Sequence, residues 1–529
     1  MTGTLTLLRL ALRRDRVPLP AWIVVIVGVV VASASAIAAL YPQAGQRIAL
    51  GVTIGAAPAL QALTGPVFDA ASVGGLTAWR GTTMTAVLAA LMSLMTVIRH
   101  TRAEEETGRA ELVGACAVGR HALAASAVLL AAASNLLIAL LITVGLAGQG
   151  LPLAGALAFG LAVGGTGWVF TAVALLAAQL TAHARTASAI AAAVLGLAFL
   201  LRALGDAAKV ETLVWLSPLG WAQRMRAFAG ERWWVVALFS VAGAVLVAAA
   251  ALVARRRDLG SRLVPAQPGV TEAAPSLRSP MALAWRLQRG VLLGWSVGFA
   301  IVGLLFGALA HSVGDIVGDN PQLAAILAAV GGAGALTDTF LAAELGLLGL
   351  VAGACAVQAT LCLQGEEAAL RAEPVLATAV ARRRWILSHL AMALGGSAVV
   401  LASGGLAAGI AHGLRIGDPF GQGGRMLGAA LVQVPATWTL AGIAMLLFGL
   451  LPRLTALAWA ALVASALLGQ LGELLQLAGW VRDLSPFAHV PRALGQPLDL
   501  GPLLWLGAVT TALLLVGMTA FQRRDVQGG

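Results

Sequence analysis

The chain alternates between long apolar runs and short polar or charged segments. Most of the apolar runs approach or exceed the roughly 20 residues that an α-helix needs to cross a bilayer. The shorter stretches of alternating apolar and polar residues that build a membrane β-barrel do not occur in the sequence. The pattern therefore predicts an all-α polytopic membrane protein.

Twelve membrane spans are predicted, six in each half of the chain. Those of the first half lie near residues 19–40, 79–98, 122–146, 152–181, 188–204 and 234–254. Those of the second half lie near residues 291–311, 339–363, 385–411, 426–450, 455–477 and 502–521. Residues 255–280, rich in arginine and proline, are expected to be a cytosolic linker. The chain thus divides into a first half, residues 1–254, and a second half, residues 281–529.

Composition agrees with a membrane protein. Hydrophobic residues make up 59% of the 529 residues and charged residues only 11%, whereas a soluble domain carries roughly a quarter charged residues. The three cysteines have the spacing of neither a zinc site nor a disulfide framework. We therefore expect no metal site.

The positive charge indicates an orientation in the membrane. The net charge is +11, and Lys209 is the only lysine. The arginines cluster at the ends of the predicted spans, so they favour orientation of the spans over binding of nucleic acid. With the amino terminus inside, 23 of the 34 basic residues fall on the cytoplasmic side. Both termini are therefore expected in the cytoplasm.

One charged block occurs twice. The first charged block, residues 104–120, superimposes on the second charged block, residues 366–382, at a shift of 262 positions. Ten of the seventeen residues are identical. The charged matches in the first block are Glu104, Glu105, Arg109, Glu111 and Arg120. Because charged residues are rare in this chain, these matches indicate a duplication.

Three further landmarks recur in the same order. Arg13, Arg16 and Trp22 match Arg286, Arg289 and Trp295; Leu216–Pro218 matches Leu484–Pro486; and Arg256–Asp258 matches Arg523–Asp525. Each half has an even number of predicted spans, so the two halves share one orientation. The pattern predicts two parallel six-helix repeats related by a pseudo-twofold axis along the membrane normal.

An amphipathic helix is predicted before the first span. Residues 4–17 combine leucine and arginine at helical spacing, and Pro18 and Pro20 follow. This pattern favours a helix on the membrane surface that ends where the prolines turn the chain into the span. Residues 281–290 repeat the pattern more weakly. The alternative is charge that serves only to orient the following span.

The two charged blocks are candidate contacts for a soluble protein. Glu105 and Arg109 are four positions apart, as are Glu367 and Arg371, so each pair would meet on one face of a continuous helix. Short apolar stretches follow, residues 112–118 and 375–380, as in helices that press against a partner. The alternative is a solvated loop that survives from the duplication.

A few polar residues fall within or near the predicted spans. Glu344 could relay protons or pair with Arg80, although a carboxylate near the end of a span can also reach water. Residues 216–234 and 484–499 follow the fifth span of each half. The tryptophans and arginines at the first of these segments predict a helix at the membrane interface, which could anchor the chain or cover an exit path.

Motifs for catalysis are missing from the sequence. No G-x-x-x-x-G-K-[ST] phosphate loop occurs, and no H-E-x-x-H motif. We also find no convincing nucleophile and base pair. The chain is therefore not expected to be an enzyme by itself, and no cofactor is expected in it.

The order of these motifs resembles the type 2 ABC exporter permeases. The shared features are the arginine-rich surface helix, the six spans, the E-E-x-x-x-R-A-E block between spans 2 and 3, the L-S-P stretch before span 6 and the terminal R-R-D. The fused twelve-span form resembles the membrane subunits of polyketide-antibiotic exporters of the tetronasin-resistance type. The resemblance covers nearly the whole chain.

The resemblance implies a permease subunit in the bacterial inner (plasma) membrane. It would export hydrophobic or amphiphilic compounds, including antibiotics, while two copies of a separate cytosolic ABC ATPase hydrolyse ATP with Mg. Coupling to the ATPase would fall to Glu104, Glu105, Arg109, Glu111, Glu366, Glu367, Arg371 and Glu373. Candidates for the substrate path between the halves are Gly196, Glu344, Gln358, Gln470 and Glu473.

Two other functions remain open at this point. A proton-coupled secondary exporter would rely on Glu344 or Glu473, because an intramembrane carboxylate can carry protons. A membrane enzyme or scaffold would transport nothing.

Overall fold

The computed structural model describes residues 2–56, 58–181, 183–255, 277–318, 332–471, 478–491, 494 and 499–525. Within these residues the regular secondary structure is helical, and no strand occurs. Eleven helices of the described part are long and apolar enough to cross a membrane. The chain is therefore an all-α polytopic membrane protein, as predicted. It forms two compact units, Met1–Pro268 (unit 1) and Gly269–Gly529 (unit 2).

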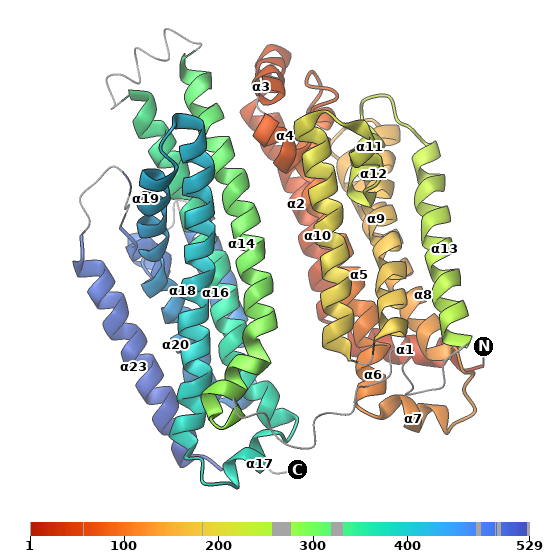
Figure 1. The fold of residues 1–529 in the computed structure, drawn as a ribbon. Coiled ribbons are helices and arrows are strands. Elements are labelled where there is room, and N and C mark those ends of the chain that lie inside the picture. Colours follow the sequence, from red (N-terminus) through yellow and green to blue (C-terminus); the bar gives the residue numbers. More distant parts are fainter. Residues whose placement is uncertain are drawn as a thin grey trace. The chain divides into compact units, whose positions relative to one another are not determined.

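Unit 1 is a bundle of long helices with short helices at both ends (Figure 1). The membrane-crossing helices are α2 (Pro18–Leu40), α5 (Val73–Arg99), α8 (Ala122–Ala147), α9 (Leu153–Leu180), α10 (Ala184–Ala208) and α13 (Trp234–Arg255). The short helices α1 (Thr4–Arg14), α6 (Arg102–Glu106) and α7 (Arg109–Gly114) lie at one end, called the block end. The opposite end carries α3 (Ala44–Ala56), α4 (Pro58–Thr64), α11 (Glu211–Trp215) and α12 (Pro218–Arg224).

Prolines and hydroxyl caps set several helix starts in unit 1. Pro18 occupies the first turn of α2, where its missing N–H costs no hydrogen bond. The amphipathic helix α1 therefore ends at Arg14 and remains separate from α2, as predicted. Ser217 caps α12 by accepting a hydrogen bond from the Gly220 N–H at 3.3 Å. The helices α3 and α4 were not predicted.

Glycines allow α9 to pack closely against α8 in the core of unit 1. A Cβ atom on Gly160 would lie 2.3 Å from the Ala139 carbonyl oxygen, and one on Gly164 would lie 2.8 Å from the Asn135 carbonyl oxygen. Asn135 also donates to the Ser93 hydroxyl of α5 at 2.9 Å. Small residues spaced four apart are typical of tight helix pairs in membranes, so this stripe holds the centre of the bundle.

Unit 2 is likewise a helical bundle. Its membrane-crossing helices are α14 (Pro280–Gly318), α16 (Gly332–Ala368), α18 (Arg382–Ile416), the consecutive pair α19 (Pro419–Leu431) and α20 (Val434–Leu450), and α23 (Gly501–Arg523). The helix α21 (Leu457–Leu471) is apolar but shorter in its described part. The short segments are α17 (Ala372–Leu376), η2 (Pro452–Leu454), α22 (Gly479–Arg482) and η3 (Pro486–His489).

Unit 2 departs from the prediction at its start. Residues 281–290 do not form a separate surface helix, because α14 runs without a break from Pro280 to Gly318. No proline follows residue 290 in the way that Pro18 and Pro20 follow α1, so nothing ends the helix there. The predicted span 455–477 corresponds to α21, and its last residues lie outside the described part. Most of the predicted linker 255–280 also lies outside it.

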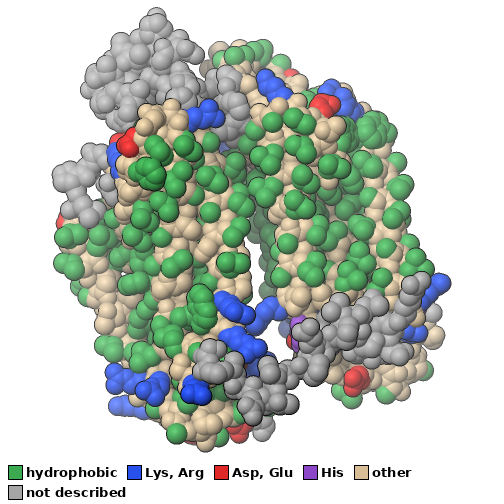
Figure 2. All heavy atoms as spheres, viewed as in Figure 1, with side chains coloured by type: hydrophobic (Ala, Val, Ile, Leu, Met, Phe, Trp, Pro, Cys, Tyr) green, Lys and Arg blue, Asp and Glu red, His purple; other side chains and the backbone are tan. Residues whose placement is uncertain are grey.

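The flanks of the bundles suit a lipid environment. Figure 2 shows hydrophobic side chains along the helix flanks, with arginines gathered toward the helix ends. Large exposed apolar side chains include Val144 at 68%, Val245 at 61% and Val399 at 61% exposed. A soluble protein rarely exposes apolar surface on this scale.

Candidate functional site

The first charged block follows α5 at the block end of unit 1. Here α6 ends at Glu106 and α7 begins at Arg109. Gly108, between them, has a φ of 73°, a left-handed conformation that glycine adopts without strain. The block therefore begins with two short helices joined by a sharp turn.

Glu104 is held by arginines rather than left to solvent. Arg14 of α1 donates from Nη1 to Glu104 Oε1 at 2.7 Å, and Arg109 Nη1 lies 3.6 Å from the same oxygen. Glu105 binds Arg102 of its own helix. Since only 9% of Glu104 is exposed, its carboxylate fastens the block to α1.

Asp15 fastens the same region to the end of α5. Its Oδ2 lies 2.6 Å from His100 Nε2, and its Oδ1 lies 2.8 Å from Arg99 Nη1. Only 3% of Asp15 is exposed. The chain between α1 and α2, residues 14–18, is called the elbow below. Two adjacent elbow residues thus bind this region: Arg14 binds the first charged block itself, and Asp15 binds the end of α5, which leads into it.

The second charged block has a similar plan in unit 2. Leu370, between α16 and α17, has a φ of 56°. Arg371 donates to Glu366 from Nε at 3.0 Å and from Nη2 at 2.9 Å. Arg524, after α23, lies 2.6 Å from Glu367. Glu366 is 7% and Glu367 6% exposed, so both acids serve to hold the turn.

The prediction of a continuous helix through the acid and base of each block is wrong. A left-handed residue, Gly108 or Leu370, breaks the helix in both copies. In each block the arginine therefore lies close to the first glutamate of the block, five positions before it. Arg109 lies near Glu104, and Arg371 binds Glu366. These pairs occupy matching positions in the two blocks, so the duplication extends from sequence to geometry.

The later part of each block faces outward. Of the eight predicted coupling residues, Arg109, Glu111, Arg371 and Glu373 are exposed. Leu112, next to Glu111, is 74% exposed. The buried glutamates hold the turns, and the exposed residues are available to a partner.

The last arginine of each block docks on the last long helix of its unit. Arg120 Nη2 donates to the Ala254 carbonyl near the end of α13 at 3.1 Å. Arg382 Nη1 donates to the Gln522 carbonyl near the end of α23 at 3.4 Å and to the Arg524 carbonyl at 2.7 Å. Carbonyls at a helix end lack partners within the helix, so each arginine joins its block to that end.

Comparison with known proteins identifies the family. A family profile described as the C-terminal domain of the multidrug efflux system permease Rv1217c matches residues 277–522. The chain is also 46% identical over 527 residues to the multidrug efflux system permease protein Rv1217c of Mycobacterium tuberculosis. That alignment covers 99% of this chain and 96% of the relative. The chain belongs to this family of multidrug efflux permeases.

The predicted substrate path of the permease remains a prediction. Gln358 accepts a hydrogen bond from Trp295 Nε1 at 2.9 Å, and Glu344 is half-buried on α16. A Cβ atom on Gly196 would meet no atom within 4 Å. The side chain of Gln470 and all of Glu473 lie outside the described residues. The pairing of Glu344 with Arg80 also remains a prediction, because Arg80 belongs to unit 1 and Glu344 to unit 2.

The permease also holds a buried ionic cluster that the sequence analysis missed. Arg202 and Asp206 of α10 have fully buried side chains whose charged groups lie 3.5 Å apart. Arg202 Nη2 donates to the carbonyls of Ala62 at 2.7 Å and Leu63 at 3.1 Å. Arg224 of α12 lies 3.6 Å from Asp206. The sequence pattern that could have revealed this cluster is a base and an acid four positions apart, Arg202 and Asp206, within an apolar helix.

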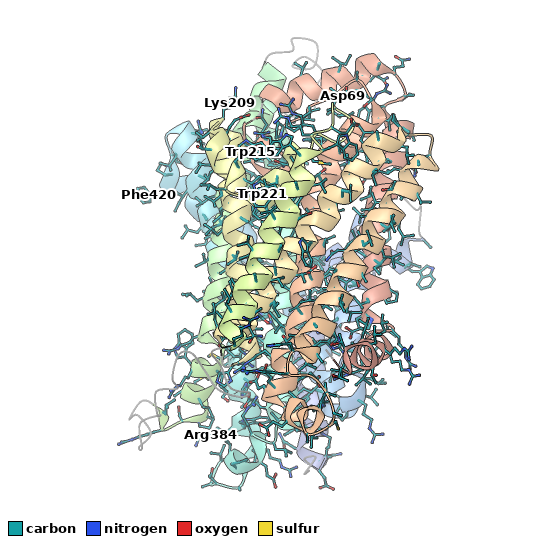
Figure 3. The ribbon with its side chains drawn as sticks, turned by 90° about the vertical axis from the view of Figure 1, so that its right-hand side faces the viewer. Asp69, Lys209, Trp215, Trp221, Arg384 and Phe420 are labelled. Atoms are coloured by element: carbon teal, nitrogen blue, oxygen red, sulfur yellow. The ribbon has the colours of Figure 1, made fainter. Side chains whose placement is uncertain are left out.

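The tryptophans of the permease near this cluster lie at the end of unit 1 opposite the first charged block. Trp215 and Trp221 share that end with Asp69 and Lys209 (Figure 3). Trp221 Nε1 donates to the Trp215 carbonyl at 2.6 Å, and the centroids of the stacked Trp215 and Trp234 rings lie 5.1 Å apart.

Among the described residues no group of three potential metal ligands occurs.

Proposed function

We propose that this chain is the membrane-spanning permease subunit of an ATP-driven exporter of hydrophobic or amphiphilic compounds, including antibiotics and other drugs. The 46% sequence identity to a multidrug efflux permease over almost the full chain supports this substrate class. The motif order supports the resemblance to exporters of the tetronasin-resistance type. The resemblance to this type of exporter favours the bacterial inner membrane, and the arginine distribution favours both termini in the cytoplasm.

ATP hydrolysis is assigned to a separate cytosolic ABC ATPase, with two copies on each permease chain. The observation that carries this assignment is the repeated geometry of the two charged blocks. In each block an arginine binds a buried glutamate five positions earlier, and an exposed charged segment follows. Two equivalent exposed surfaces on one chain suit two copies of one partner.

Coupling would act through the contacts that hold each block. ATP would close the two ATPase subunits and press them against the blocks. The first block continues directly from α5, is tied to α1 by Arg14, and is tied to α13 by Arg120. A displacement of the block therefore reaches several helices of its unit. The two halves would then alternate between inward-open and outward-open states.

The direct test reverses the exposed charges. Reversal of Arg109 and Arg371 to Glu should lower drug-stimulated ATP hydrolysis at least about tenfold in liposomes that hold the permease and its ATPase. Those arginines also bind Glu104 and Glu366, so a second variant, Glu111→Arg with Glu373→Arg, changes exposed residues outside those pairs. Both variants should insert normally into the membrane.

A matched control lies at the other end of unit 1. Lys209→Glu reverses an exposed charge there and should leave stimulated hydrolysis unchanged. Normal drug export by both double variants would rule out the charged blocks as the coupling surface.

A further inference from the structure

We propose that unit 1 holds a binding site for an anionic amphiphile between the elbow and α5, directly behind the first charged block. The proposal deepens the proposed function. An effect of the bound ligand on ATPase coupling would rest on that function, whereas binding of the ligand to unit 1 would not.

The site is a cavity of about 280 Å³ at the block end of unit 1. Leu19 and Trp22 of α2 line one wall, and Met95 and Ile98 of α5 line another. Ser188 of α10 lines a third side. Pockets for small ligands begin at roughly 300 Å³ and are mostly apolar with a few polar groups. These walls suit the apolar body of an amphiphile.

Arg99 supplies the charge at this cavity. Its side chain lines the cavity and is 45% exposed. Its Nη1 pairs with Asp15, and a guanidinium carries five N–H donors in all. Asp15 is almost fully buried between Arg99 and His100, whereas the Arg99 side chain is 45% exposed. The N–H donors of Arg99 that do not face Asp15 suit an acidic head group as the ligand.

The cavity adjoins the contacts that position the first charged block. Ala103 lines the cavity, and the next residue, Glu104, binds Arg14 of the elbow. Asp15 of the elbow lines the cavity as well. A ligand between the elbow and α5 would therefore bear on the ion pairs that hold the block.

The corresponding elbow residues differ in unit 2. Leu287 and Gln288 stand where unit 1 has Arg14 and Asp15, at the shift of 273 positions that aligns Arg13 with Arg286. Gln288 lies 3.2 Å from His389. Arg14 and Asp15 thus have no charged counterpart at these positions of unit 2, and the proposed site is assigned to unit 1 alone.

Binding can be measured on the purified full-length chain in phosphatidylcholine nanodiscs. The probe is dansylaminoundecanoic acid, a fluorescent single-chain acid, and uncharged oleyl alcohol and oleate are competitors. We expect oleate to displace the probe at least about tenfold more effectively than the alcohol. Arg99→Gln and Ser188→Trp, which remove the charge and fill the cavity, should each weaken probe binding at least about tenfold.

Two control variants accompany these measurements. Arg9→Gln removes an exposed arginine from α1, and Ser188→Thr leaves the cavity open. Both should bind the probe as the unaltered chain does. Binding that survives in both Arg99→Gln and Ser188→Trp, or equal competition by oleyl alcohol, would overturn the proposal.

A lipid or a free acid could supply the same chemistry. Competition by dioleoyl phosphatidylglycerol as well as oleate supports the site with a lipid occupant, and competition by oleate alone supports it with a free acid. Loss of ATPase coupling in the charged-block variants is measured separately. Probe binding together with unaltered ATPase coupling in the charged-block variants would keep the site and reject the proposed coupling, and loss of coupling in those variants without any probe binding would do the reverse.

Discussion

Single arginines hold together both ends of unit 1. At the block end Arg14 reaches Glu104, 90 positions away, and at the opposite end Arg202 reaches the Ala62 carbonyl, 140 positions away. A pattern read along the chain cannot reveal such contacts, because they depend on how helices meet in the folded bundle. The sequence therefore pointed to the charged residues of the first block without showing which of them are buried.

The Arg14–Glu104 pair can be tested by exchange of its charges. Arg14→Glu should lower drug-stimulated ATP hydrolysis several-fold, because two carboxylates would then face each other where one hydrogen-bonded ion pair stood. Arg14→Glu combined with Glu104→Arg should recover most of the activity. Equal activity of the single and the double variant would show that the pair has no part in positioning the block.

The buried cluster at the opposite end predicts a large effect on stability. Arg202→Ala leaves Asp206 with Arg224 as its remaining buried partner and removes the donor to two carbonyls, which should cost about 3 kcal/mol, near the lower end for a broken buried ion pair. Arg185→Ala, an exposed arginine on the same helix, should cost less than about 0.5 kcal/mol. Thermal unfolding in detergent compares the two variants. The same midpoint for both would contradict the structural role of Arg202.

At the scale of helices, length and apolarity were enough to locate most spans. The predicted spans 122–146 and 234–254 differ by only one residue at one end from α8 and α13. The prediction failed where tertiary structure decides. The helices α3 and α4 are too short for a span, and Leu370 adopts a left-handed conformation that leucine rarely takes.

Close helix contacts predict which glycines tolerate a side chain. Gly160→Ala would place a Cβ atom against the Ala139 backbone, so the helices must move apart, at a cost of about 1–3 kcal/mol. In unit 2 a Cβ atom on Gly307 would lie 2.0 Å from the Ala408 carbonyl oxygen, so Gly307→Ala should destabilise the protein by a similar amount. Gly196→Ala has open space and is the control. Thermal unfolding that ranks Gly196→Ala with the other two would contradict this packing.

At the scale of the whole molecule, each unit has an apolar core of its own. Phe159 and Phe170 are fully buried in the core of unit 1, whereas Trp385, Phe448 and Phe521 pack together in unit 2. The repeated landmarks indicated this division, because each set recurs in the same order. The proposed passage of substrate between the halves would involve residues of both units, which a pattern read along the chain does not bring together.

Two separate cores predict that the chain can be divided. Residues 1–268 and 269–529, produced as two polypeptides in one cell, should assemble and restore drug export to within a few-fold of the intact chain. Either piece alone should insert into the membrane and export nothing. Drug accumulation assays measure the outcome. Two inserted but inactive pieces would show that the covalent connection is essential.

The central claim, that the two charged blocks bind two ATPase copies, is most directly tested by site-specific photocrosslinking. A benzoylphenylalanine in place of Glu111 or of Glu373 should give one adduct with the ATPase, and both together should give a product with two ATPase copies. The same group in place of Arg415, exposed near the end of α18, should give none. Absence of ATPase adducts from both block positions, in membranes where the subunits co-purify, would contradict the account.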